Sequence, residues 1–194
     1  MNPVTLAALM DELEKVAQSA YPGLEDLQKK LRPGDILVGH SRDPGVVGGL
    51  VGGVLAVRQG TKDYHSAMYV GDGHVVDGHA SRGITKMPLE SFADLYKFKA
   101  LKVKARRKWR RRAVEFAEQS VGKEFNLMGV LRQALPARAA NGPRVREATD
   151  SYFCSQLISN AYDKVPFAKK THIGDVRPVD FAKSSLTKTL GEVR

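Results

Sequence analysis

Cysteine is almost absent from this chain: of its 194 residues only one, Cys154, carries a thiol. A single cysteine excludes a disulfide within the chain, so the composition does not point to an oxidising compartment. It also excludes the paired Cys-x-x-Cys pattern of structural zinc sites. Any thiol chemistry in this protein therefore depends on one residue.

Long apolar runs are missing as well. A membrane-spanning helix needs about 20 apolar residues, and the closest stretch, Val46 to Val57, is short and interrupted by glycines. The N-terminus lacks the basic-then-apolar order of a secretory signal. From these absences we expect a protein of the cytoplasm or of a virus particle.

Acidic residues are outnumbered, with 31 lysines and arginines against 21 aspartates and glutamates and a formal net charge of +10. Seven of the positive charges, and none of the negative ones, fall between Lys104 and Arg112. Such a concentration suggests a local anionic partner, such as an anionic polymer or a membrane surface, although an arginine-rich helix is often only a solvated face. The residues expected to form this patch are Arg106, Arg107, Lys108, Arg110, Arg111 and Arg112.

The stretch from Tyr64 to His79 has the pattern of a β-hairpin. Alternating apolar residues lead into Gly71-Asp72-Gly73, a turn that tolerates positive φ, and a second run follows. His65 opens the first strand and Asp77 closes the second, so we expect the two side chains to lie close together. An imidazole beside a carboxylate can act as a general base with its orienting partner.

Cys154 supplies the nucleophile that this pair lacks. It lies where the sequence predicts the start of a buried helix, and both the helix N-terminus and a neighbouring imidazolium would favour the thiolate. We therefore expect a cysteine hydrolase or acyl-transfer enzyme in which Cys154 attacks, His65 is the base and Asp77 orients it. The backbone N–H of Cys154 would donate to an oxyanion, and Tyr64 or Tyr152 is a candidate for a second donor.

The residues alone leave other interpretations open. A lone cysteine on an amphipathic helix is commonly a small buried hydrophobe, and His74 or His79 competes with Asp77 as the third member. A metal site could draw on the same histidines and Cys154. However, His74 and His79 are an odd number of residues apart, so a single strand would point them to opposite faces. We expect neither a metal nor a cofactor.

The chain divides into three parts by pattern. Residues 1–30 read as a helical extension that packs on the domain or docks to a larger assembly, 31–184 as the catalytic domain, and 185–194 as a polar tail that frays. Within the domain, Phe98 to Val103 has the apolar–basic alternation of an edge strand. The segment from Pro136 to Asp150 has the composition of a flexible loop and could form a lid over Cys154.

Several short motifs together resemble a known family, the circularly permuted NlpC-type papain-like proteins, which include lecithin:retinol acyltransferase-like enzymes and bacterial YiiX-like hydrolases. His65 to Asp77 is similar to the family's histidine-bearing hairpin. Tyr152 to Leu157 resembles its Tyr-x-Cys-Ser-Glu-Leu motif, and the order of histidine before cysteine agrees. Arg32 to Leu37, Gly83 to Phe92 and Arg177 to Asp180 resemble its Pro-Gly-Asp strand, its Pro-Leu-x-x-Phe segment and its late Pro-x-Asp.

The resemblance covers about Leu31 to Ser184 and implies an α+β permuted papain-like fold, with a small antiparallel sheet packed against the cysteine-bearing helix. It also implies Cys154 as nucleophile, His65 as base and the position of Asp77 as third member. That position is usually Glu in the bacterial branch and His in the acyltransferase branch, so the shorter Asp is a departure. The family explains neither residues 1–30 nor the basic cluster.

Three functions follow as expectations. The first is an amidase or peptidase that acts on bacterial cell-wall (peptidoglycan) peptides, with delivery by a phage particle. The second is a lipid or thioester acyl hydrolase or acyltransferase at a membrane surface, where the arginines would bind headgroups. The third is a structural or nucleic-acid-binding protein of a virion, built on the same fold.

Overall fold

The computed structural model describes residues 21, 23–43, 61–127, 129–130, 151–163, 165–167 and 176–194. The predicted helix that precedes residue 21, the glycine-rich centre of 44–60 and the predicted lid at 136–150 lie outside these residues. Among the described residues, no helix is both long enough and apolar enough to cross a membrane.

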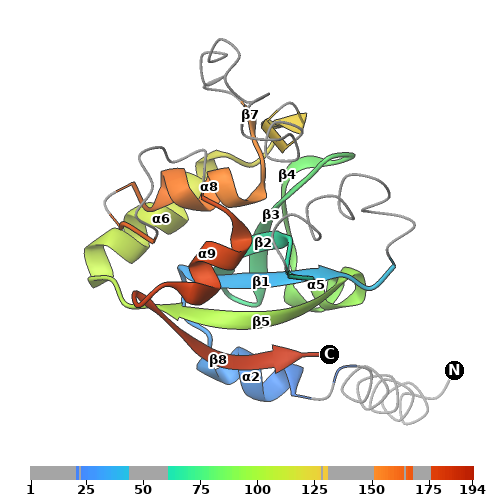
Figure 1. Ribbon diagram of the computed structural model, residues 1–194, viewed down its shortest axis with the longest axis vertical. Coiled ribbons are helices and arrows are strands. Elements are labelled where there is room, and N and C mark those ends of the chain that lie inside the picture. Colours follow the sequence, from blue (N-terminus) through green and yellow to red (C-terminus); the bar gives the residue numbers. More distant parts are fainter. Residues whose placement is uncertain are drawn as a thin grey trace, which may run out of the picture.

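The fold is α+β, with helices on both faces of a six-stranded antiparallel sheet (Figure 1). The strand order in the sheet is β4-β3-β2-β1-β5-β8. The strands are β1 (Asp35–Ser41), β2 (His65–Gly71), β3 (His74–His79), β4 (Gly83–Pro88), β5 (Tyr96–Val103) and β8 (Thr187–Val193). A small parallel pair joins β6 (Glu124–Phe125) to β7 (Ser151–Tyr152).

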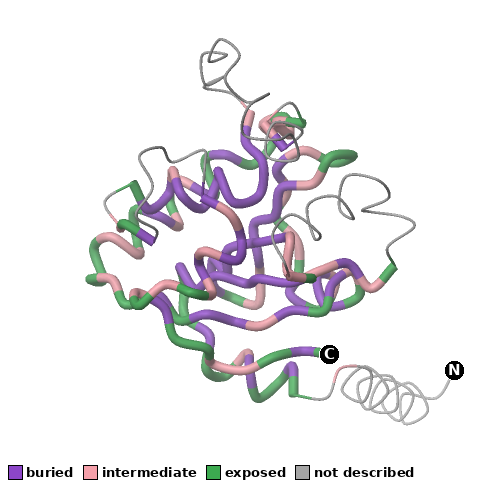
Figure 2. Tube along the Cα trace, in the orientation of Figure 1, coloured by how far each residue is buried: buried purple, intermediate pink, exposed green. Residues whose placement is uncertain are grey.

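Two apolar layers enclose the sheet, and Figure 2 shows that its central strands are buried. Three helices contribute to the first layer: α6 (Arg107–Gln119), α8 (Cys154–Ala161) and α9 (Pro178–Lys183). The second layer contains residues of α2 (Leu24–Lys30) and α5 (Leu89–Leu95). All of β2 is buried because its successive side chains enter opposite layers: Met68 lies in the first layer and Ala67 in the second.

The hairpin forms as the sequence predicts. Its turn places Gly71, Asp72 and Gly73 at φ values of 107°, 50° and 69°, in the left-handed region where glycine and aspartate are tolerated. β2 and β3 then pair in a register that sets Ala67 opposite Asp77.

The expectation that residues 185–194 fray is wrong. β8 pairs with β5 along its length, with Val193 opposite Phe98 at one end and Thr187 opposite Val103 at the other. β5 therefore lies inside the sheet and is not its edge. Thr187 and Val193 are buried while most of the polar side chains between them are at least partly exposed, as expected of a strand at a sheet edge. α2, which falls within the predicted extension, packs against this strand.

One arginine of the basic cluster is part of the framework. The Nη2 atom of Arg110 lies 2.7 Å from Oδ1 of the fully buried Asp35. The guanidinium of Arg110 also donates to the carbonyl oxygens of Arg32, Pro33 and Val103. Arg110 therefore joins α6 to the start of β1 and the end of β5, and a guanidinium with five fixed donors suits this position better than an ammonium.

Candidate active site

The predicted pairing of His65 with Asp77 is present in the structure. Nε2 of His65 lies 2.6 Å from Oδ1 of Asp77, and both residues are buried. The contact follows from the register: Asp77 is opposite Ala67, and His65, two residues earlier on β2, points to the same face of the ladder.

Cys154 is the first residue of α8, as the sequence predicts, and it meets this pair across β3. A Cβ atom added to Gly78, which follows Asp77, would lie 3.6 Å from the backbone nitrogen of Cys154 and 3.7 Å from its Cα. The backbone of β3 at Gly78 thus lies next to the first turn of α8, at a separation that a Cβ atom would fill with ordinary van der Waals contacts. The thiol of Cys154 lies close enough to His65 to raise the pKa of the imidazole, so the structure brings Cys154, His65 and Asp77 together.

The imidazole of His65 is held in its charged form. Burial on its own would lower the pKa of His65, but the negative charge of Asp77, the hydrogen bond to Asp77 and the contact with Cys154 outweigh burial and raise the pKa to about 10. With Nε2 donating to Asp77, Nδ1 is the nitrogen left to face the thiol. The arrangement therefore places an imidazolium beside the sulfur of Cys154 at neutral pH.

Two aromatic rings stack on the imidazole. The ring of Tyr96 lies 4.4 Å from that of His65 with an interplanar angle of 9°, and Phe92 stacks in turn on Tyr96 at 4.6 Å. Tyr96 is fully buried, and no hydrogen bond of the described residues reaches its hydroxyl. Burial, together with the charge of Asp77, raises the pKa of Tyr96, so the phenol stays neutral.

The second oxygen of Asp77 faces the turn between β3 and β4. Oδ2 accepts no hydrogen bond from the described part of the chain, and Nη2 of Arg82 lies 3.7 Å from it. His79 is close by, and burial, followed by the charge of Arg82, lowers its pKa. Neither His79 nor His74 takes the place of Asp77 beside His65, because their Nδ1 atoms contact Ser81 and the carbonyl of Asp72, respectively.

The first turn of α8 carries unpaired backbone donors, as every helix start does. Oε1 of Gln156 accepts from the N–H of Phe153 and from the side chain of Asn126, which fixes the residue before Cys154. Cys154 is the first residue of α8, so its N–H lies at the positive end of the helix dipole. A developing oxyanion would be stabilised there.

The two tyrosines proposed as oxyanion donors lie in different surroundings. Tyr64 accepts a hydrogen bond from the N–H of Ser41 through its hydroxyl, and its ring packs near Phe153, next to Cys154. Tyr152 instead packs edge-on against Phe116, with Nζ of Lys123 5.2 Å from its ring centroid. Tyr152 is thus part of the contact with α6.

The residues expected to form an anionic-partner patch separate into two groups. Arg110 is directed into the framework described above. The others lie at or near the start of α6 with exposed side chains: Arg106, Arg107, Lys108, Arg111 and Arg112. The described residues contain no group of three or more His, Cys, Asp or Glu side chains placed to hold a metal ion.

Sequence reasoning missed Gly78, Tyr96 and Arg82. The signal for Gly78 was present, since an isolated glycine in a strand often marks a close backbone approach. For Tyr96 there was no local signal, because its contact with His65 joins the first residue of β5 to the first residue of β2. Arg82 lies in the turn between β3 and β4, whose geometry the residue types alone do not fix.

The chain matches no protein-family model, and a search of curated proteins finds no significant match.

Proposed function

We propose that this protein is a cysteine-dependent hydrolase of the circularly permuted NlpC-type papain-like group. One observation carries the proposal: His65 interacts with both Cys154 and Asp77, and its Nε2 lies 2.6 Å from Oδ1 of Asp77. The antiparallel sheet with a cysteine at the start of a helix packed against it supports the permuted papain-like assignment.

The chemistry proceeds by acyl transfer to sulfur. The Cys154 thiolate attacks the carbonyl carbon of the substrate, and the N–H of Cys154 donates to the oxyanion that forms. The imidazolium of His65 then gives its proton to the leaving amine as the C–N bond breaks, which leaves a thioester on Cys154. Water, deprotonated by His65, attacks the thioester and releases the acid, while Asp77 keeps the ring oriented throughout.

We propose that the substrate is a short peptide of the bacterial cell wall, cleaved by an amidase or peptidase activity. The family that the chain resembles includes enzymes of this kind, which supports this choice of substrate. The test is to incubate purified peptidoglycan fragments with the wild type and with Cys154→Ala. New amino termini should appear with the wild type only. Release of acyl groups from esters or thioesters, with cell-wall peptides left intact, would contradict the amidase assignment.

Activation of the thiol is tested separately from the choice of substrate. We expect iodoacetamide to alkylate Cys154 quickly at pH values well below ~8.5, where an ordinary cysteine is mostly protonated. His65→Ala should remove this fast reaction. Equal and slow alkylation of both proteins would mean that His65 does not activate the thiol, and the hydrolase proposal would fail.

A further inference from the structure

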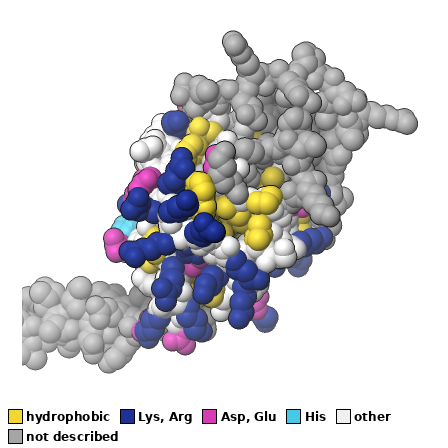
Figure 3. All heavy atoms as spheres, turned by 90° about the vertical axis from the view of Figure 1, so that its left-hand side faces the viewer, with side chains coloured by type: hydrophobic (Ala, Val, Ile, Leu, Met, Phe, Trp, Pro, Cys, Tyr) yellow, Lys and Arg dark blue, Asp and Glu magenta, His cyan; other side chains and the backbone are white. Residues whose placement is uncertain are grey.

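The exposed side of α6 forms a surface distinct from the catalytic site. Ala113 and Ala117 turn inward to the core. The side chains of Arg106, Arg107, Lys108, Arg111 and Arg112, which we name the basic stripe, remain exposed. Figure 3 shows apolar side chains on one face of the molecule with lysines and arginines around them.

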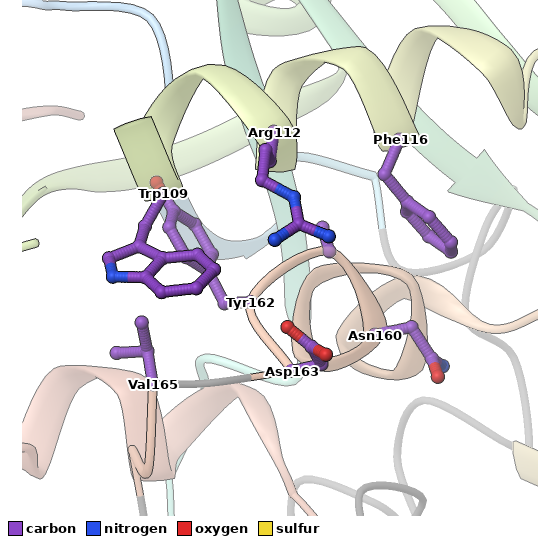
Figure 4. A pocket seen from close by; sticks show the side chains of 8 residues that line it. Trp109, Arg112, Phe116, Asn160, Tyr162, Asp163 and Val165 are labelled. Atoms are coloured by element: carbon purple, nitrogen blue, oxygen red, sulfur yellow. The ribbon is translucent and has the colours of Figure 1, made fainter. Parts of the chain in front are cut away.

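A pocket of about 210 Å³ lies beside this stripe, between α6 and the C-terminal end of α8 (Figure 4). Its lining is both aromatic and polar and includes Trp109, Arg112, Phe116, Asn160, Tyr162 and Asp163. The pocket adjoins the last turn of α8, whereas Cys154 begins that helix, and none of Cys154, His65 and Asp77 lines it. The catalytic chemistry therefore does not account for this cavity.

The aromatic wall of the pocket is interleaved with cations. Nζ of Lys108 lies 4.8 Å from the ring centroid of Trp109, and Cζ of Arg112 lies 5.3 Å from it. Figure 4 shows the guanidinium of Arg112 extending from α6 toward Asp163. A planar group entering the pocket would meet the indole, the flat guanidinium and the ring of Phe116, while its anionic attachments would meet the basic stripe.

We propose that the pocket and the basic stripe bind single-stranded nucleic acid, with a base in the pocket and the flanking phosphates on the stripe. Proteins that bind single strands combine aromatic or guanidinium planes, on which bases stack, with a cationic track for the backbone. The chain places both features on one helix. This inference does not depend on the hydrolase activity.

Two other anionic partners fit the surface less well. A membrane surface favours apolar side chains that protrude, but here they line a hollow; the large apolar side chains exposed in the described residues are Val121 and Leu127, and neither lines the pocket. A polyanion without planar groups would use the stripe and leave the aromatic pocket empty. Only a nucleic acid uses both.

Trp109 is the single tryptophan of the chain, so its fluorescence reports directly on the pocket. Two measurements use the whole protein. The anisotropy of a fluorescein-labelled oligodeoxythymidine measures the affinity. The fluorescence of Trp109 is followed while unlabelled oligodeoxythymidine or, separately, inorganic polyphosphate of matched charge is added. We expect the unlabelled oligonucleotide to quench the fluorescence of Trp109 and the polyphosphate to leave it largely unchanged. By anisotropy, Trp109→Ala should weaken oligonucleotide binding about tenfold or more.

The basic stripe is tested with a charge-matched pair of double variants. Arg107→Ala/Arg111→Ala should weaken binding and reduce the slope of log affinity against log salt by more than one, since each phosphate contact contributes about 0.7 for single strands. Lys97→Ala/Lys188→Ala removes the same charge from exposed positions on β5 and β8 and should change the slope little. Circular dichroism establishes that all variants are folded.

Three results would overturn the proposal: no quenching of Trp109 by the oligonucleotide, equal loss of affinity in the two double variants, or unchanged affinity in Trp109→Ala. Sedimentation with phosphatidylglycerol vesicles, in the absence of oligonucleotide binding, would assign the surface to a membrane instead. The alkylation rate of Cys154 should remain at the wild-type value in all stripe variants, so this test is independent of the hydrolase proposal.

Discussion

The ring of Tyr96 lies parallel to the imidazole of His65, with centroids 4.4 Å apart and planes inclined by 9°. Phe92 packs against both rings, with its centroid 4.6 Å from that of Tyr96 and 6.2 Å from that of His65. The imidazole thus has a fixed plane as well as a fixed hydrogen-bond partner. Because proton transfer needs both donor and acceptor aligned, we infer that Tyr96 is a positioning residue for His65.

The stack can be tested by separating the ring of Tyr96 from its hydroxyl. Tyr96→Phe keeps the ring and removes a buried hydroxyl that has no partner among the described residues, so stability should be unchanged or slightly higher. Tyr96→Leu removes the stack and should shift the pH profile of Cys154 alkylation and slow the reaction several-fold. If both variants alkylate at the wild-type rate across the pH range, the stack does not position the imidazole.

The charge of Asp77 is expected to set the protonation of His65. In Asp77→Asn the side chain keeps its size but loses its charge, so burial should dominate and the pKa of His65 should fall well below about 10. Alkylation of Cys154 near pH 6 should then slow about tenfold or more. Imidazole chemical shifts measured by NMR against pH report the pKa directly.

Asp77→Glu is the matched control, since it restores the charge on a chain one methylene longer. Because Asp77 is fully buried, the longer acid should rescue the pKa of His65 only in part. We expect the alkylation rates to follow the order wild type, Asp77→Glu, Asp77→Asn. A pKa of His65 that is the same in all three proteins would rule out the charge of Asp77 as its cause.

Stability should depend on pH through the same histidine. The pKa of His65 is about 10 in the folded protein and ~6.5 in an unfolded chain. Since the folded state holds the proton more tightly, the contribution of His65 is complete below pH ~6.5 and is lost as the pH rises to about 10. Between pH 7 and pH 10 the wild type should therefore lose roughly 2–4 kcal/mol relative to His65→Gln.

Denaturant unfolding of the two proteins at a series of pH values measures this difference. Both proteins share every other titrating group, so subtracting their free energies of unfolding isolates His65. A difference that stays constant from pH 7 to pH 10 would show that the imidazole gains no proton affinity on folding.

Arg110 and Arg111 are adjacent in sequence but should differ greatly in their contribution to stability. Arg110→Ala leaves Asp35 buried without its ion pair and should cost roughly 3–5 kcal/mol in the free energy of unfolding. Arg111→Ala removes the same charge from an exposed side chain that pairs with the exposed Glu115, and should cost less than ~0.5 kcal/mol. Chemical denaturation distinguishes the two, and equal losses would contradict the framework role of Arg110.

Much of the site could be predicted because its signals are local. Alternating apolar residues around Gly71-Asp72-Gly73 predicted the hairpin, and the hairpin brings His65 to Asp77. The apolar spacing after Cys154 predicted a helix that begins there. The proximity of Cys154 to His65 was expected because the His65–Asp77 pair lacks a nucleophile and because the family resemblance implies it, since no local pattern joins α8 to β2.

The parts that could not be predicted depend on contacts between distant segments. β8 is polar in sequence because one of its edges faces solvent, so its pairing with β5 leaves little trace in composition. The inward direction of Arg110 did have a signal: it precedes Ala113 by three residues and Ala117 by seven, which is the spacing of the buried helix face. The large number of positive charges around it concealed that spacing.

The position of β8 also bears on how the chain is made. Until residues 187–193 have left the ribosome, β5 has no partner on one side, although β1, β2, β3 and β4 are already available to pair. During that interval the backbone donors and acceptors of β5 form an open edge that another chain could extend. The sheet of a growing chain is therefore exposed to intermolecular pairing until residues 187–193 have been translated, and a pause in synthesis before that point would prolong the exposure.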